Sequence, residues 1–170
     1  MKQLLTVRSP FPDVYPSLAF EAGRQISFMC DGPPPRATAQ QKGEVVKGGK
    51  VIHYEKENVA EAREWIERRI VEYVPSRPLS GPLCLEIYWV YRWLNRHLSP
   101  DGGKKDLVGG KSMVLCPNRP DCDNLSKLFK DCLQAAGFMQ DDSQVAVLIF
   151  LKAWGDDPGI ATRITELKTQ

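Results

Sequence analysis

The stretch DCDNLSKLFKDCLQAAGFMQDDSQVAVLIFLKAW, residues 121–154, decides the fold. Its first part predicts a helix with one buried face, because apolar residues recur three and four positions apart: Leu125, Leu128, Phe129, Cys132, Leu133 and Ala136. Gly137 then suits the left-handed conformation that often ends helices, with Phe138 placed to pack back. Residues 141–143 predict a turn, and the apolar run over 144–154 predicts a central strand buried on both faces.

The residues around this unit predict further strands and a second helix. Alternating apolar residues over 83–93 predict a long strand, whose aromatic side chains favour core packing over base stacking. An apolar stripe predicts a helix that begins after an N-cap at Asn58, with Glu61 completing a capping box, and ends at Pro75. Short strands are predicted at residues 25–31, 51–54, 112–116 and 160–167.

These elements predict one small domain of the α/β (α+β) class, with a mixed β-sheet and two main helices. The domain is expected to span residues 25–170, preceded by an irregular N-terminal extension over residues 1–24. A chain of 170 residues is long enough to bury one core.

Composition predicts a cytoplasmic protein. The longest apolar run is far shorter than the ~20 residues that span a bilayer, and residues 1–24 lack the apolar core of a signal peptide. Five cysteines, an odd number without a CxxC pair, predict reduced and mostly buried thiols rather than a zinc site.

The net charge of +2 says little about partners, but its distribution says more. Residues 92–119 hold six basic and two acidic side chains, and residues 36–56 hold five basic and two acidic ones. Both segments suit contact with a phosphate backbone, and solvated loop charge is the equal alternative. The candidate DNA-binding residues are Lys104, Lys105, Lys111 and Arg119.

Four residues carry the candidate chemistry. Asp121 and Asp123 lie where a long loop becomes the helix, Lys127 lies one turn later, and Asp142 begins the strand that follows. A helix–turn–strand reversal is expected to bring Asp142 back beside Asp123. Three hard carboxylates suit Mg²⁺, with Mn²⁺ as an alternative, and phosphodiester hydrolysis uses such ions.

Each residue also has an ordinary structural interpretation. Asp123 fits an N-cap, and Lys127 fits a surface pair with Asp123 or Asp131. Asp141 and Asp142 fit a turn. The residues alone therefore indicate no more than a divalent-metal site.

The motif resembles the signature of the RusA family of Holliday-junction resolvases. That signature reads Asp-x-Asp-Asn-Leu-x-Lys, a helix, and then Asp-Asp-x-Gln-Val, and here it spans residues 121–127 and 141–145. The resemblance implies a homodimeric Mg²⁺-dependent endonuclease that cuts opposed strands of a four-way DNA junction in recombination and repair. It implies metal ligands at Asp121, Asp123 and Asp142, an essential lysine at Lys127, and a secondary acidic neighbour at Asp141.

Two departures from the family pattern affect substrate preference. Residues 116–120, CPNRP, replace the arginine run that precedes the first aspartate in well-known members, and the loop over residues 95–120 is longer. The alternatives are a metal-dependent nuclease for flaps, forks or other branched DNA, and a non-catalytic protein that binds DNA structures.

Overall fold

A six-stranded mixed sheet forms the centre of the computed structural model, which describes residues 4–7, 18–38, 42–47, 49–100 and 112–168. The strand order is β1-β2-β8-β5-β7-β6. The bounds are β1 Leu4–Val7, β2 Leu18–Asp31, β5 Leu83–Arg92, β6 Met113–Leu115, β7 Val145–Gly155 and β8 Gly159–Lys168. Strands β5 and β7 are parallel, and the other pairs are antiparallel.

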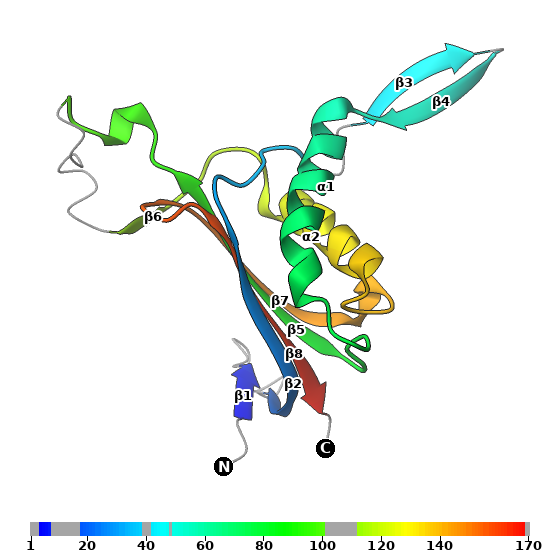
Figure 1. The fold of residues 1–170 in the computed structure, drawn as a ribbon, viewed down its shortest axis with the longest axis vertical. Helices are drawn as coiled ribbons and strands as arrows, with labels where there is room; N and C mark the ends of the chain where they lie inside the picture. The colour runs from blue at the N-terminus through cyan, green and yellow to red at the C-terminus, as the bar shows by residue number, and fades with distance from the viewer. Residues whose placement is uncertain (1–3, 8–17, 39–41, 48, 101–111, 169–170) are drawn as a thin grey trace, which may run out of the picture.

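Two helices cover one face of this sheet (Figure 1). They are α1, Glu57–Ile70, which continues into a 3₁₀ turn at Val71–Tyr73, and α2, Cys122–Ala136. The chain passes through α2 on its way from β5 to the parallel strand β7, as such a connection requires. The predicted mixed sheet with two main helices is confirmed.

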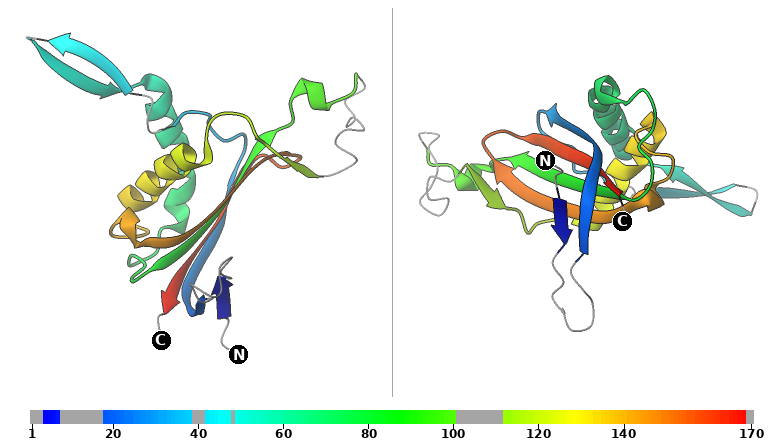
Figure 2. Two further views of the ribbon diagram at one scale, coloured as in Figure 1. Left: turned by 180° about the vertical axis from the view of Figure 1, so that it is seen from behind. Right: turned by 90° about the horizontal axis from the view of Figure 1, so that it is seen from below.

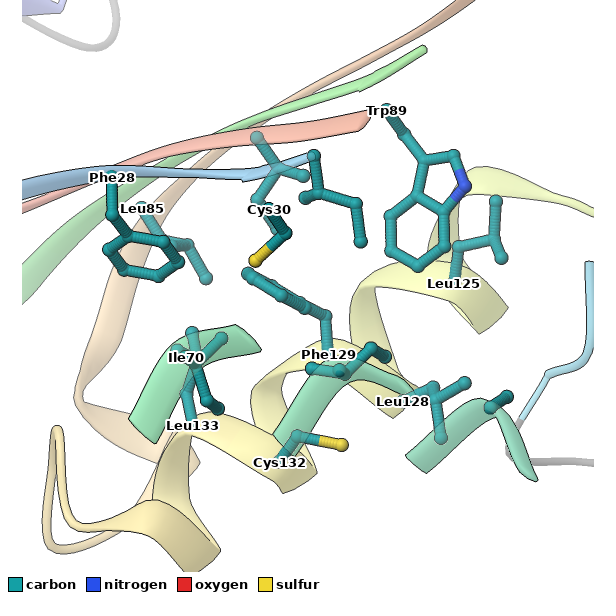
Figure 3. Close-up of a cluster of buried hydrophobic side chains, with 14 of the residues drawn as sticks. Phe28, Cys30, Ile70, Leu85, Trp89, Leu125, Leu128, Phe129, Cys132 and Leu133 are labelled. Carbon is teal, nitrogen blue, oxygen red and sulfur yellow. The ribbon is translucent and has the colours of Figure 1, made fainter. Parts of the chain in front are cut away.

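The core lies between the helices and the sheet (Figure 3). The predicted apolar face of α2 is confirmed, since Leu125, Leu128, Phe129, Cys132 and Leu133 are all buried. The aromatic strand β5 packs into the same core, where Trp89 meets the edge of Phe129 at 6.2 Å between ring centroids. This packing rigidly positions α2, whose first turn carries the candidate acids.

The end of α2 also follows the prediction. Gly137 has φ = 92°, a left-handed conformation that favours glycine. Its N–H donates to the carbonyl of Gln134, and the N–H of Phe138 donates to the carbonyl of Leu133 at 3.0 Å. Phe138 is fully buried, so the chain turns sharply toward the candidate residue Asp142.

The irregular conformation predicted for residues 1–24 is wrong for its described part. Residues 4–7 form β1, and β2 begins at Leu18, seven residues before the predicted start at Gln25. Both strands are held by pairing with distant partners: Leu4 lies opposite Glu21, and β2 lies along β8. Because these strands depend on partners that are distant in the sequence, their residues before Gln25 show no alternation of apolar and polar side chains that would predict them.

Two other predictions need correction. Helix α1 begins at Glu57 with Lys56 in the N-cap position, so Asn58 lies inside the helix rather than at its N-cap. Strand β7 pairs with β5 along its length but with β6 only at residues 153–155. Among the described residues, no strand pairs with the outer edge of residues 145–151, so that part of β7 is not central. Leu148 and Ile149 are 43% and 45% exposed there.

A separate hairpin is formed by β3, Lys42–Lys47, and β4, Lys50–Glu55. It extends away from the body of the domain at the start of α1, as both views in Figure 2 show. The short strand predicted at residues 51–54 is confirmed as part of β4.

The five cysteines are free thiols, and all except Cys122 are buried, as predicted. Burial raises the pKa of Cys30 and of Cys132 to about 12, which leaves both thiols protonated and inert. No helix in the described part of the chain combines the length and apolar character that crossing a membrane requires.

Candidate active site

Two of the predicted acids lie at the start of α2. Asp121 occupies the N-cap position in an extended conformation, and its side chain makes no capping hydrogen bond. Asp123 lies in the first turn, so the interpretation of Asp123 as the N-cap is wrong. Both side chains are exposed. Their carboxylates therefore stand in solvent, where the positive end of the helix dipole favours anionic groups.

A buried lysine of the sheet holds the loop before Asp121 in place. Lys152 of β7 is only 8% exposed. Its ammonium group donates to the carbonyl oxygens of Asn118 and Pro120, and its own carbonyl accepts from the N–H of Cys116 at 2.9 Å. Sequence reasoning missed Lys152, although a lysine inside an apolar strand is itself a signal of a buried partner.

Asp142 lies in a short 3₁₀ turn, Asp142–Gln144, between α2 and β7. Asp141 caps this turn by accepting from the N–H of Ser143 at 2.9 Å, and hydrogen bonds from Ser143 lower the pKa of Asp141. The side chain of Gln144 accepts from the N–H of Asp141 at 3.1 Å. Asp141 is thus the turn former, which leaves the carboxylate of Asp142 available for other contacts.

Two lysines of α2 lie near acidic side chains. Lys127, 57% exposed, lies 3.9 Å from Asp131, one of the two partners considered for a surface pair. Lys130, which sequence reasoning missed, donates to the Asp142 carboxylate at 3.1 Å. The sequence pattern does not predict this contact of Lys130, because its partner Asp142 is twelve residues away in the chain.

The acids therefore lie at opposite ends of α2. The backbone N–H of Asp142 donates to the side chain of Gln134, near the C-terminal end of this helix, whereas Asp121 precedes its N-terminus. A helix of fifteen residues is about 22 Å long. Among the described residues, no group of three histidine, cysteine, aspartate or glutamate side chains is arranged to hold a metal ion. The carboxylates suit Mg²⁺ by their chemistry, but the expected reversal does not bring Asp142 to Asp123 within one chain.

Basic side chains adjoin the first acid. A cavity of about 360 Å³ beside Asp121 is lined by Arg36, Thr38, Arg119, Pro120, Asp121 and Asn124. Of the predicted DNA-binding residues, Arg119 is thus close to the acids, whereas Lys104, Lys105 and Lys111 lie outside the described residues. Arg36 belongs to a basic segment that the sequence singled out, but the prediction gave it no role.

Comparison with known proteins then identifies the family. The family model of endodeoxyribonuclease RusA matches residues 33–165. The chain belongs to the RusA family. This match contains both helices, the acids and lysines described above, and the cavity beside Asp121. A comparison with curated proteins finds no match.

RusA membership confirms the resemblance drawn from the motif and supports a nuclease. The match begins just after β2 and ends inside β8. Strands β1 and β2 therefore lie outside it, and so does the segment before residue 18.

Proposed function

We propose that the protein is a Mg²⁺-dependent, structure-selective endodeoxyribonuclease of the cytoplasm that resolves four-way DNA junctions by paired incisions, in recombination and repair. The observation that carries the proposal is the set Asp121, Asp123 and Lys127 on the first turns of α2, inside the RusA match. An exposed carboxylate, that of Asp121, lines one cavity with Arg36 and Arg119, as expected where a metal ion and a phosphate bind together.

Asp121, Asp123 and Asp142 are the proposed ligands of Mg²⁺, with Mn²⁺ as a substitute. A bound divalent ion supplies an activated water and stabilises charge on the oxygens of the reacting phosphate. The chain's own contribution is to hold the ligands in place. Lys152 pins the loop before Asp121, the Asp141 cap orients Asp142, and Lys127 adds positive charge one turn from Asp123.

The separation of the acids supports a site shared between two copies of the chain. A homodimer with two-fold symmetry places the same two patches in contact twice. We propose that Asp142 of one copy completes the site formed by Asp121 and Asp123 of the other. Two such sites related by the two-fold axis suit paired incisions in opposed strands.

The edge of β7 that no described strand covers is the proposed dimer contact. Residues 145–151 present an edge with exposed Leu148 and Ile149, and such edges pair readily with a second strand. When two β7 strands pair antiparallel, the start of one lies beside the end of the other. Asp142 precedes the start of β7, and Lys152 near its end holds the loop before Asp121. The pairing therefore carries Asp142 toward Asp121 of the second copy.

Lys127→Ala is expected to lower the cleavage rate by about a hundredfold, because it removes a positive charge beside the reacting phosphate. The change should cost less than about 0.5 kcal/mol of unfolding free energy, since an exposed ion pair contributes little. Cleavage rates and thermal melting measure the two effects.

Asp131→Asn is the matched control, because Asp131 is the partner of Lys127. It should leave the rate nearly unchanged. Equal losses of activity in both variants, or a large fall in melting temperature for Lys127→Ala, would make Lys127 a structural residue.

The loop over residues 92–119 and the segment over residues 42–56, which holds the β3–β4 hairpin, are proposed to line the DNA path. Replacing Lys104, Lys105 and Lys111 by alanine together should weaken junction binding. It should also reduce the log–log dependence of affinity on salt by up to about three units, at about 0.9 per lost phosphate contact. Binding titrations at several salt concentrations measure the slope. An unchanged affinity and slope would remove this loop from the interface.

A substrate panel tests the proposed function. Cleavage rates with Mg²⁺ should be highest for a four-way junction, lower for forks and flaps, and lowest for linear duplex. A preference for forks or flaps would favour the general branched-DNA nuclease. Tight junction binding without cleavage in Mg²⁺ or Mn²⁺ would favour the non-catalytic binding protein.

A further inference from the structure

The cavity beside Asp121 is formed by two segments that are distant in the sequence. Residues 36–38 follow the proline run after β2, and residues 119–124 lead into α2. Both segments are anchored in the core on either side of the cavity: Ala37 and Thr38 are buried, and so is Leu125. The side chains that line the cavity are thus held on firm backbone.

Arg36 packs its guanidinium group against an aromatic ring. Its guanidinium carbon lies 4.6 Å from the centre of the Tyr91 ring, within the range of a cation–π contact. Tyr91 is itself only 2% exposed, so the ring is a rigid support. Within the described part of the chain, Arg36 forms no ion pair. Its charge is thus preorganised and not neutralised by a described carboxylate.

Arg119 faces the same cavity from a loop that is also fixed. The carbonyls on either side of it, of Asn118 and Pro120, accept hydrogen bonds from the buried ammonium of Lys152. Arg119, like Arg36, has no carboxylate partner among the described residues. Two arginines on anchored backbone and the N-terminal end of α2 therefore line one open space.

We propose that this cavity binds one phosphate group of the DNA backbone, with Arg36 and Arg119 as its two anchors. The inference rests on the proposed function and extends it from the acids to substrate binding. A guanidinium group donates two parallel hydrogen bonds to phosphate oxygens, which a lysine cannot match. Asp121, a proposed metal ligand, lines the same cavity.

The test is junction binding in metal-free buffer, which does not depend on cleavage. Arg36→Ala should weaken binding about tenfold and reduce the log–log salt slope by about 0.9. Arg36→Lys should keep the slope, because the charge remains, but recover only part of the affinity. Arg68→Ala is the matched control, since Arg68 is a 75% exposed arginine that pairs with Glu64 on α1.

Junctions that carry a single neutral methylphosphonate identify the phosphate. With the wild-type chain, one position should weaken binding strongly, and this penalty should disappear in Arg36→Ala. Added inorganic phosphate should compete with the junction less effectively for Arg36→Ala than for the wild type.

Two results separate this inference from the proposed function. Binding by Arg36→Ala that equals that of Arg68→Ala, with the same methylphosphonate penalties as the wild type, would overturn the phosphate cavity even if the enzyme cuts junctions. A wild-type chain that binds through Arg36 but never cuts DNA would overturn the proposed function and leave the phosphate cavity supported.

Discussion

Asp121→Asn, Asp123→Asn and Asp142→Asn are each expected to lower the rate of junction cleavage on the order of a thousandfold or more. Each change removes a proposed ligand of the metal that activates water and stabilises charge on the phosphate. Rates under single-turnover conditions with saturating enzyme measure the effect apart from binding. Full activity in any of the three would remove that residue from the site.

These losses should occur without unfolding. The Asp121 side chain makes no capping hydrogen bond. Asp142 forms a partly exposed pair with Lys130, of a kind worth at most about 1 kcal/mol. Binding in metal-free buffer should be equal or tighter, because a carboxylate that repels phosphate is gone. Asp157→Asn, in the exposed turn between β7 and β8, is the matched control and should cut normally.

Mixing two inactive variants is expected to restore cleavage. In a heterodimer of Asp123→Asn and Asp142→Asn chains, one shared site keeps every acid and the other loses two. The heterodimer, purified through two different tags, should therefore nick one strand of a junction without the paired incision. Each variant alone should be inactive. Denaturing gels of junctions labelled on each strand in turn distinguish nicks from paired cuts.

The control pair combines Asp121→Asn with Asp123→Asn. Both acids lie at the same end of α2, so each shared site in that heterodimer lacks one of them, and it should stay inactive. Inactivity of the Asp123→Asn and Asp142→Asn heterodimer as well would mean that the three acids act within one chain. Asp142 would then have to move along α2 from its contact with Lys130.

The sequence predicted those helices and strands that are determined by residues close together in the chain. Helix α2 follows from the spacing of its apolar residues, and its end follows from the one glycine that has the left-handed conformation there. The acids of this region were predicted as a metal site from their residue types, whereas their individual roles came from the family motif. Those roles remain predictions.

The neighbours of strand β7 could not be predicted from its local sequence pattern. A run of apolar residues describes a strand that avoids water, but it does not say whether the same chain or a second one covers it. Leu148 and Ile149 fit either case by their chemistry, and the structure leaves them exposed. Which strand lies beside β7 depends on the pairing of the whole sheet.

Long-range contacts explain the other differences. Lys152 contacts the loop before Asp121, and Lys130 contacts Asp142 across the turn. These partners are too far apart in the sequence for a helical or strand periodicity to predict the contacts. Arg36 likewise meets Arg119 across a cavity only because the segment after β2 packs beside the start of α2. Residue types therefore predict the chemistry of the candidate site, whereas the contacts between distant segments are found only in the fold.

Incubation of the wild-type chain with a four-way junction, with both opposed strands labelled, tests the central claim most directly. The account predicts paired, symmetrically placed incisions in the presence of Mg²⁺, and intact junction when EDTA replaces the metal. Incisions that persist in EDTA, or a junction that stays intact in both Mg²⁺ and Mn²⁺, would contradict it.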